Sequence, residues 1–288
     1  MKISEAFDLY KNNYMFVKGL SRRVLQNQDY VKNRLIKTLG DIDINNLTLD
    51  DISHWNTALL FREMPDGTLQ KRTNNTIRND LIRLKMVLRY MRLIGEDCIN
   101  PELIPVPKRE DKRRSFLTPE EVTSMINNAT SVRNKLVISL FYASGIRLSE
   151  LIQLDRDSIY DRQFTVVGKG KKSRTCYIDE RTERLMQEYL SSRHDNCPAL
   201  IISVLNKSRM TPTNVELLIK NSAKKAGITK NVFPHLLRHS FATDFIRSGG
   251  NIRYLSPILG HASINTTMIY THVVDNDLKK EYEMYHNY

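Results

Sequence analysis

A proline-rich and strongly basic segment near residue 110 most constrains how this chain can fold. Three prolines in residues 101–107 interrupt any helix, and Lys108 to Arg114 carry five basic and two acidic side chains. Such a segment is typical of an extended linker between domains, because proline cannot continue a helix. Directly after it, Thr118 and Glu121 form a capping-box pattern that predicts the start of a new helix. With 288 residues, the chain is long enough for two domains that bury separate cores.

The part before this segment, residues 1–104, has the pattern of a helical bundle. Thr48 with Asp51 predicts the start of one helix, which runs through the single tryptophan, Trp55, and an Asp-Gly pair at 66–67 predicts a turn. Apolar residues recur at helical spacing over 77–91. The basic side chains on the other faces of that helix form either a solvated surface or a surface that faces phosphate. They are Arg78, Arg83, Lys85, Arg89 and Arg92.

The part after residue 117 alternates briefly between helix and strand and then returns to helix. Two β-rich runs separated by a Gly/Lys turn predict a hairpin, and glycines follow several of the apolar helical patterns as expected C-terminal stops. The fold class is therefore mainly α with a small β-sheet (α+β). Helices are expected over 135–144, 182–192, 212–226, 234–247, 252–259 and 263–270, and strands over 164–167 and 175–178.

The charge of the chain narrows the classes of partner. Its 44 basic and 32 acidic side chains give a formal net charge of +12 and a pI of about 9.5, which favours a polyanion: nucleic acid or an anionic membrane surface. No apolar run approaches the roughly 20 residues of a membrane span, and the N-terminus turns polar too early for a signal peptide. Three cysteines of irregular spacing indicate neither a disulfide framework nor a zinc site. We expect a cytoplasmic protein.

One group of residues near the C-terminal end can perform phosphoryl chemistry. Residues 235–270 contain His235, Arg238, His261 and Tyr270, and a further arginine, Arg147, lies upstream. Guanidinium and imidazole groups can hold a phosphate, and a phenol can attack it. Forming a phenolate at pH 7 costs roughly 4 kcal/mol, since tyrosine has a pKa near 10. Two guanidinium groups that grip the phosphate oxygens would offset that cost.

The amino-acid sequence around these residues resembles that of the tyrosine recombinase family, and the spacing of the motifs is similar to that of its Xer branch. The resemblance rests on the segments Ala143–Leu151, His235–Thr243, Leu259–His261 and Tyr270–His272, together with the Gly-Lys-Gly at 168–170, and covers nearly the whole chain. It implies a helical N-terminal DNA-binding domain of the core-binding (SAM-like) kind over residues 1–104. A basic linker would span 105–117, and a catalytic domain with a protomer-docking tail would span 118–288.

The resemblance also implies a role for each site residue. Tyr270 would attack the phosphorus and form a 3′-phosphotyrosyl bond. Arg147, Arg238 and His261 would hold the phosphate oxygens, His235 would exchange a proton with the nucleophile, and Lys169 would protonate the leaving 5′ oxygen.

Four further residues have expected roles of their own. Lys171 and Lys172 are rival positions for the lysine. We expect Glu150 to orient Arg147, the alternative being a surface salt bridge. His239 and His272 are expected to be structural.

The implied partner is double-stranded DNA, bound by a homotetramer on two synapsed sites, without a membrane, metal or other cofactor; whether a regulatory protein takes part is unknown. The biological outcome would be resolution of chromosome or plasmid dimers. Integration of a phage or mobile element uses the same chemistry and stays open as an alternative. A type IB topoisomerase and a non-catalytic DNA-binding protein are more distant alternatives.

Overall fold

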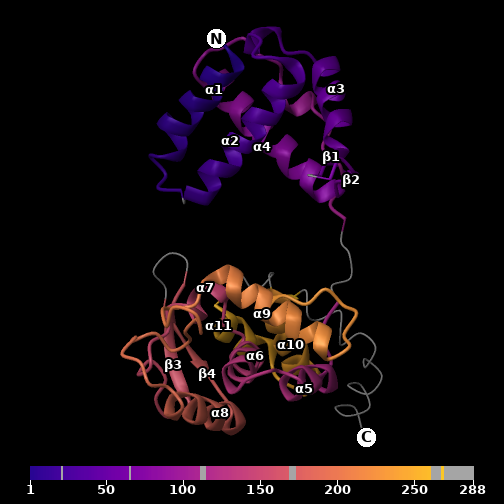
Figure 1. The fold of residues 1–288 in the computed structure, drawn as a ribbon. Coiled ribbons are helices and arrows are strands. Elements are labelled where there is room, and N and C mark those ends of the chain that lie inside the picture. The colour runs from indigo at the N-terminus through magenta and orange to yellow at the C-terminus, as the bar shows by residue number, and fades with distance from the viewer. Residues whose placement is uncertain (21, 65, 111–114, 169–172, 261–266, 269–288) are drawn as a thin grey trace, which may run out of the picture. The chain divides into compact units, whose positions relative to one another are not determined.

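The computed structural model describes residues 1–20, 22–64, 66–110, 115–168, 173–260 and 267–268. The chain divides into two compact units, Met1–Arg113 and Arg114–Tyr288 (Figure 1). Each unit has a hydrophobic core of its own. The break between the units falls inside the basic segment. The finer division at residues 104 and 117 stays a prediction.

The first unit is a bundle of helices whose apolar faces meet in one core. The cap at Thr48 is formed as predicted, because its hydroxyl accepts from the Asp51 amide at 3.1 Å and the Asp51 carboxylate accepts from the Thr48 amide at 2.9 Å. Trp55 is fully buried in the core. The helices are α1 (Ile3–Tyr10), α2 (Arg22–Leu39), α3 (Leu49–Leu59) and α4 (Asn74–Leu93), with a π-helical turn at Lys11–Met15 and 3-10 turns at Ile44–Asn46 and Pro101–Leu103.

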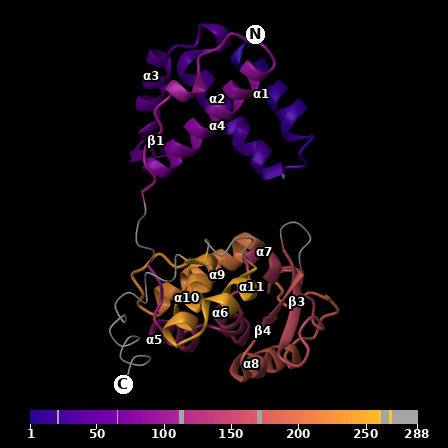
Figure 2. The ribbon, with the colours of Figure 1, turned by 180° about the vertical axis from the view of Figure 1, so that it is seen from behind.

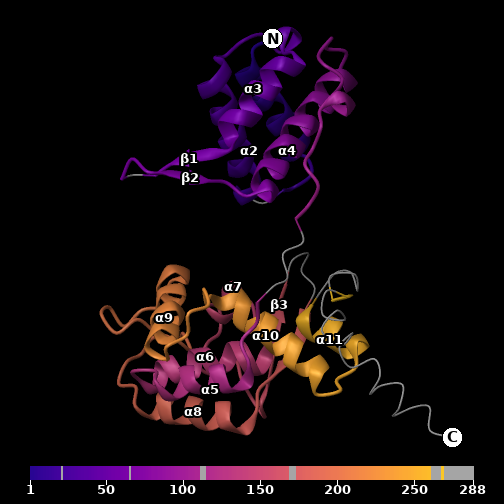
Figure 3. The same cartoon turned by 90° about the vertical axis from the view of Figure 1, so that its right-hand side faces the viewer.

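A hairpin that the sequence pattern did not reveal connects α3 to α4. Strands β1 (Phe61–Glu63) and β2 (Leu69–Lys71) pair antiparallel, and Figure 3 shows them extending away from the helices of this unit. The turn at Asp66 and Gly67 was predicted: Asp66 accepts from the amide and hydroxyl of Thr68, and Gly67 has a φ of 78°. Strands of three residues are too short to show a period of two, so only their turn was visible in the sequence.

Four of the five basic side chains of α4 donate hydrogen bonds to the segment that follows the helix. Among these, the bond from Arg78 reaches the expected linker, and the other three hold residues 98–104. A surface that faces phosphate stays a prediction. Arg78 donates to the carbonyl of Pro107 (2.8 Å), Lys85 to that of Ile104 (3.3 Å), Arg92 to that of Cys98 (2.7 Å), and Arg89 to the carboxylate of Glu102 (2.7 and 2.9 Å).

The second unit begins at the predicted cap. The Thr118 hydroxyl accepts from the Glu121 amide, and the Glu121 carboxylate accepts from the Thr118 amide and from Lys230. The predicted helices and strands between residues 118 and 260 lie within a few residues of their expected positions, and the short helix α7 was not predicted. The helix expected over 263–270 lies outside the described residues apart from 267–268. The helices and strands of this unit are α5 (Pro119–Asn127), α6 (Val132–Ser144), α7 (Leu148–Leu151), β3 (Gln163–Val167), β4 (Ser173–Tyr177), α8 (Glu180–Ser191), α9 (Pro212–Lys225), α10 (Pro234–Arg247) and α11 (Ile252–Leu259).

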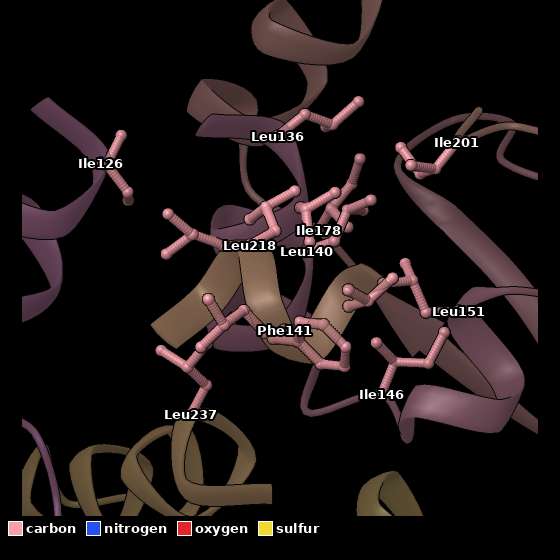
Figure 4. Close-up of a cluster of buried hydrophobic side chains, with 14 of the residues drawn as sticks. Ile126, Leu136, Leu140, Phe141, Ile146, Leu151, Ile178, Ile201, Leu218 and Leu237 are labelled. Carbon is pink, nitrogen blue, oxygen red and sulfur yellow. The ribbon is translucent and has the colours of Figure 1, made fainter. Parts of the chain in front are cut away.

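Helix α6 forms the centre of this unit. Leu136, Leu140 and Phe141 are fully buried, and Figure 4 shows them among apolar side chains from other elements of the unit. A helix that is apolar on every side must be covered on every side, and α5, α8, α9 and α10 all contact it. The end of α6, where Gly145 follows Ser144, is thereby held at a fixed place in the unit.

The fold is mainly α, as predicted, with two small antiparallel sheets among the described residues instead of one. In the hairpin of the second unit, Phe164 and Val166 alternate with exposed neighbours, so one face packs on the core. Strand β4 also contacts α11, and Figure 2 shows the two next to each other. In the described part of the chain, no helix is long and apolar enough to cross a membrane.

Candidate active site

The first arginine is placed by a glycine turn at the end of α6. Gly145 has a φ of 60°, and a Cβ there would lie 2.6 Å from the ring of Phe241. Only glycine fits without displacing that ring. Two residues later, Arg147 caps the short helix α7, and its side chain is about one-third exposed, at 35%. The turn therefore places the Arg147 guanidinium at the surface, while Gly145 in the turn is itself buried.

Glu150 fixes the orientation of that guanidinium. Its carboxylate accepts from the Arg147 amide at 2.8 Å and from Arg147 Nη1 at 2.9 Å. The Glu150 side chain is only 6% exposed, so this contact is an internal one and not the surface salt bridge that was the alternative. Burial raises the pKa of Glu150, but hydrogen bonds from Arg174 and Arg147 outweigh burial and lower the pKa to about 2. The carboxylate is therefore ionised at neutral pH.

Arg174 is the residue of this cluster that the sequence did not reveal. It lies on β4, 24 residues after Glu150, and binds that carboxylate through both terminal nitrogens at 2.7 and 2.8 Å. Its Nε donates to the carbonyl of Ile258 near the end of α11. It belongs to a strand of ordinary amphipathic pattern and to no motif that we recognised, so no local signal marked it.

Helix α10 contributes the second arginine and the first histidine. Arg238 is 1% exposed, and it donates to the carbonyls of Gly145 and Leu259, at 2.5 Å each. His235 lies in the first turn of the same helix and is exposed. Arg238 therefore lies inside the unit, and His235, three residues earlier, lies at its surface.

The two arginines nevertheless meet at the end of α11. Arg147 Nη2 donates to the carbonyl of Gly260 at 2.9 Å, and Arg238 donates to the preceding carbonyl, that of Leu259. Elements that are about 90 residues apart in sequence thus bring two guanidinium groups to neighbouring peptide units. His239, expected to be structural, is buried at 6% exposure.

Six of the residues considered from the sequence lie outside the described residues. They are Lys169, its rivals Lys171 and Lys172, His261, Tyr270 and His272. Their described neighbours belong to the cluster: Gly260 accepts the hydrogen bond from Arg147, and β4, which begins at Ser173, carries Arg174. The proposed roles of these six residues stay predictions.

A polar hollow on the first unit was also not anticipated. It has a volume of about 320 Å³ and lies between α2 and α4 over the ion pair of Arg34 with Asp80, whose atoms are 2.6 Å apart. Amide, phenol and guanidinium groups of this kind can hydrogen-bond to phosphates and base edges. The hollow is lined by Asn27, Tyr30, Arg34, Thr76, Asn79, Asp80 and Arg83.

The described residues contain no group of three or more His, Cys, Asp or Glu side chains that could hold a metal ion. The three cysteines are free thiols. Cys98 and Cys176 are buried, and Cys197 is half-buried.

Comparison with known proteins shows the family of the chain. Residues 115–277 match the phage integrase family. A tyrosine recombinase of Thermosipho africanus is 34% identical over 241 residues, which are 81% of this chain and 83% of the relative. Tyrosine recombinase XerA of Pyrococcus horikoshii is 34% identical over 218 residues, 74% of this chain and 75% of the relative. The fold is similar to that of the Tn1549 transposon integrase in complex with transposon right-end DNA, with a TM-score of 0.78 at 19% identity and 99% coverage of both chains.

The family match and these relatives define an enzyme that cleaves and rejoins DNA. The chain belongs to the phage integrase family and is a tyrosine recombinase, with Xer proteins among its relatives.

Proposed function

We propose that this protein is a site-specific recombinase of the Xer type that cleaves DNA through a phosphotyrosyl intermediate. The observation that carries the proposal is the meeting of Arg147 and Arg238 at neighbouring carbonyls at the end of α11. Two guanidinium groups close together form a site for one phosphate, since each can grip oxygens through a planar fork. His261 directly follows Gly260 in the chain, which makes it the natural third ligand of that phosphate.

The chemistry uses groups of the protein and the DNA alone. The Tyr270 oxygen attacks the phosphorus, the bond from phosphorus to the 5′ oxygen breaks, and Lys169 gives that oxygen a proton. His235 takes up the proton of the phenol. Charge that builds on the non-bridging oxygens is stabilised by Arg147, Arg238 and His261. The phosphodiester energy is kept in the tyrosyl ester, so the 5′ hydroxyl of another strand can reverse the attack and join the new partner.

The family and the charge support a proposal for the biological setting. The formal net charge of +12 suits a duplex partner, and curated relatives carry the names XerA, XerC and XerD. We infer a cytoplasmic homotetramer on two synapsed sites that resolves chromosome or plasmid dimers, with the segment around Leu278 to Tyr285 docking on a neighbouring protomer. Integration of a mobile element is the rival outcome of the same chemistry.

The decisive experiment is trapping of the covalent intermediate. The protein is incubated in EDTA with nicked duplexes that carry candidate sites from its own genome, and a denaturing gel shows any protein–DNA adduct. We expect an adduct with the wild type and none with Tyr270→Phe, while both proteins bind the duplex equally. Tyr160→Phe is the matched control, because the phenol of Tyr160 is 83% exposed and lies outside the motifs. The Tyr160→Phe protein should still form the protein–DNA adduct.

The outcomes separate the candidate functions. An adduct that survives Tyr270→Phe would refute the assigned nucleophile, and tight binding without any adduct would favour a non-catalytic protein. Exchange between two sites on one plasmid indicates a recombinase, whereas relaxation of supercoils without exchange indicates a topoisomerase. Insertion of a circular element into a second molecule, in preference to resolution of a dimer, would favour the integrase.

A further inference from the structure

Three successive carbonyls at the C-terminal end of α11 each accept a hydrogen bond from a different arginine. Arg174 donates to Ile258 at 2.8 Å, Arg238 to Leu259 at 2.5 Å, and Arg147 to Gly260 at 2.9 Å. The last carbonyls of a helix have no partner within it and carry partial negative charge. Cations from β4, α10 and the turn before α7 therefore satisfy this helix end together.

Arg174 differs from the other two because it also forms a complete fork with a buried carboxylate. Its two terminal nitrogens contact the two oxygens of Glu150, and those same oxygens hold the amide and guanidinium of Arg147. The side chains of Arg174 and Glu150 are 8% and 6% exposed. Four donors on one buried carboxylate leave it a single orientation, so a displacement of Arg174 must displace Arg147.

The backbone of α11 is fitted to Arg174 as well. A Cβ on Gly260 would lie 2.7 Å from Cδ of Arg174, and Gly260 has a φ of 61°. A side chain at position 260 would push the arginine off Glu150 and would be strained in this conformation. Gly260, Arg174 and the Glu150 carboxylate thus fit closely together between the hairpin and the end of α11.

We propose that Arg174 is a positioning residue for DNA cleavage: it fixes Arg147 through Glu150, and its bond to the Ile258 carbonyl holds Arg174 itself in place. The proposal rests on the proposed function, because it takes Arg147 as a ligand of the scissile phosphate. Arg174 joins three parts of the unit: strand β4, the turn that carries Arg147, and the end of α11. It acts through Arg147 and does not itself touch the phosphate.

The test is a double-mutant cycle on the rate of cleavage. Single-turnover rates of adduct formation are measured at saturating protein for the wild type, Arg174→Lys, Arg147→Ala and the double variant. Lysine keeps the charge but has no fork, so Arg174→Lys should slow cleavage by about 10- to 100-fold, the usual effect of losing the partner that orients a ligand. Affinity for the duplex should change by less than about threefold, because the charge remains.

The cycle separates positioning from general damage. If Arg174 acts through Arg147, its substitution should slow cleavage no further once Arg147 is alanine, within about twofold. Equal losses in both backgrounds, or no loss in the single variant, would overturn the proposal. Arg147→Lys serves as the background if the alanine variant is too slow to measure. Arg174→Ala provides a second comparison. If Arg174→Ala cleaves more slowly than Arg174→Lys, the positive charge that lysine retains partly rescues the reaction.

Arg193→Lys is the matched control for the loss of a buried arginine. Arg193 is 3% exposed, bridges Asp195, and caps the carbonyls of Ala199 and Leu200 with no connection to Arg147. It should lower thermal stability, yet leave the cleavage rate below its unfolding temperature within about twofold of the wild type. If the wild type itself forms no adduct, the proposed function fails. If the wild type is active but the cycle shows no coupling, only the positioning role fails.

Discussion

The ionised carboxylate of Glu150 should make the second unit sensitive to acid in a way that a single substitution removes. Its pKa is about 2 in the folded protein, against an ordinary value of 4.5. A carboxylate with a depressed folded pKa contributes stability that is complete above the unfolded pKa and is lost as pH falls toward the folded pKa. The relevant window therefore runs from about pH 4.5 down to about pH 2.

The size of the effect follows from these two values. The full difference of 2.5 pKa units corresponds to about 3 kcal/mol of unfolding free energy, and about 2 kcal/mol of it should be lost between pH 6 and pH 3. Glu150→Gln cannot titrate, and at neutral pH it should cost several kcal/mol because it leaves Arg147 and Arg174 without their counter-charge. The stability gap between the two proteins should accordingly narrow by about 2 kcal/mol on acidification.

Urea unfolding at a series of pH values measures this gap. Far-UV circular dichroism follows both units, while Trp55, the single tryptophan, lies in the core of the first unit and reports on that unit. The transition seen by fluorescence should therefore be the same in both proteins and serves as an internal control. A gap that stays constant from pH 6 to pH 3 would refute the depressed pKa and with it the four-donor description of Glu150.

Four other substitutions test three separate features of the structure. Thr118→Ala removes the cap of α5 and should lower the stability of the second unit by about 1 kcal/mol in urea unfolding, whereas an unchanged midpoint would contradict a working cap. Gly145→Ala and Gly227→Ala both place a side chain at positive φ, but only the first has no room for a Cβ. Gly227→Ala should cost about 1 kcal/mol and Gly145→Ala clearly more, so equal melting temperatures would contradict the tight turn. Arg89→Ala breaks an exposed pair with Glu102 and should change the stability of the first unit, followed by tryptophan fluorescence, by less than about 1 kcal/mol; a larger loss would mean that this pair holds the following segment more strongly than its exposure suggests.

The sequence predicted the helices of the second unit well because their ends carry strong local signals. Thr118 with its capping box, Gly145 and Gly260 mark helix ends through their own chemistry, and these signals do not depend on distant residues. Arg147 and Arg238 were found for a different reason: they occur in segments whose amino-acid sequence resembles that of a known family. The contact between Arg147 and Glu150 also followed from their spacing of three residues.

The contacts that the sequence could not predict all join segments far apart in the chain. Arg174 meets Glu150 across 24 residues and Ile258 across 84, and nothing in the strand around it indicates either partner. The basic side chains of α4 were ambiguous because a helical pattern shows which face they occupy but not which acceptors reach it. Lys85 is 9% exposed and donates to a carbonyl 19 residues away, which only the folded chain reveals.

The shared end of α11 limits how this cleavage machinery can be transferred to another scaffold. A designer who copies Arg147 and Arg238 alone would place two cations beside a helix end whose third carbonyl, that of Ile258, accepts no hydrogen bond from an arginine. Glu150 would also lack the paired hydrogen bonds from Arg174. The smallest set that keeps both arginines held as they are is the turn at Gly145 with α7, the hairpin strand with Arg174, helix α10 with Arg238, and the whole of α11 through Gly260, moved together with their relative geometry.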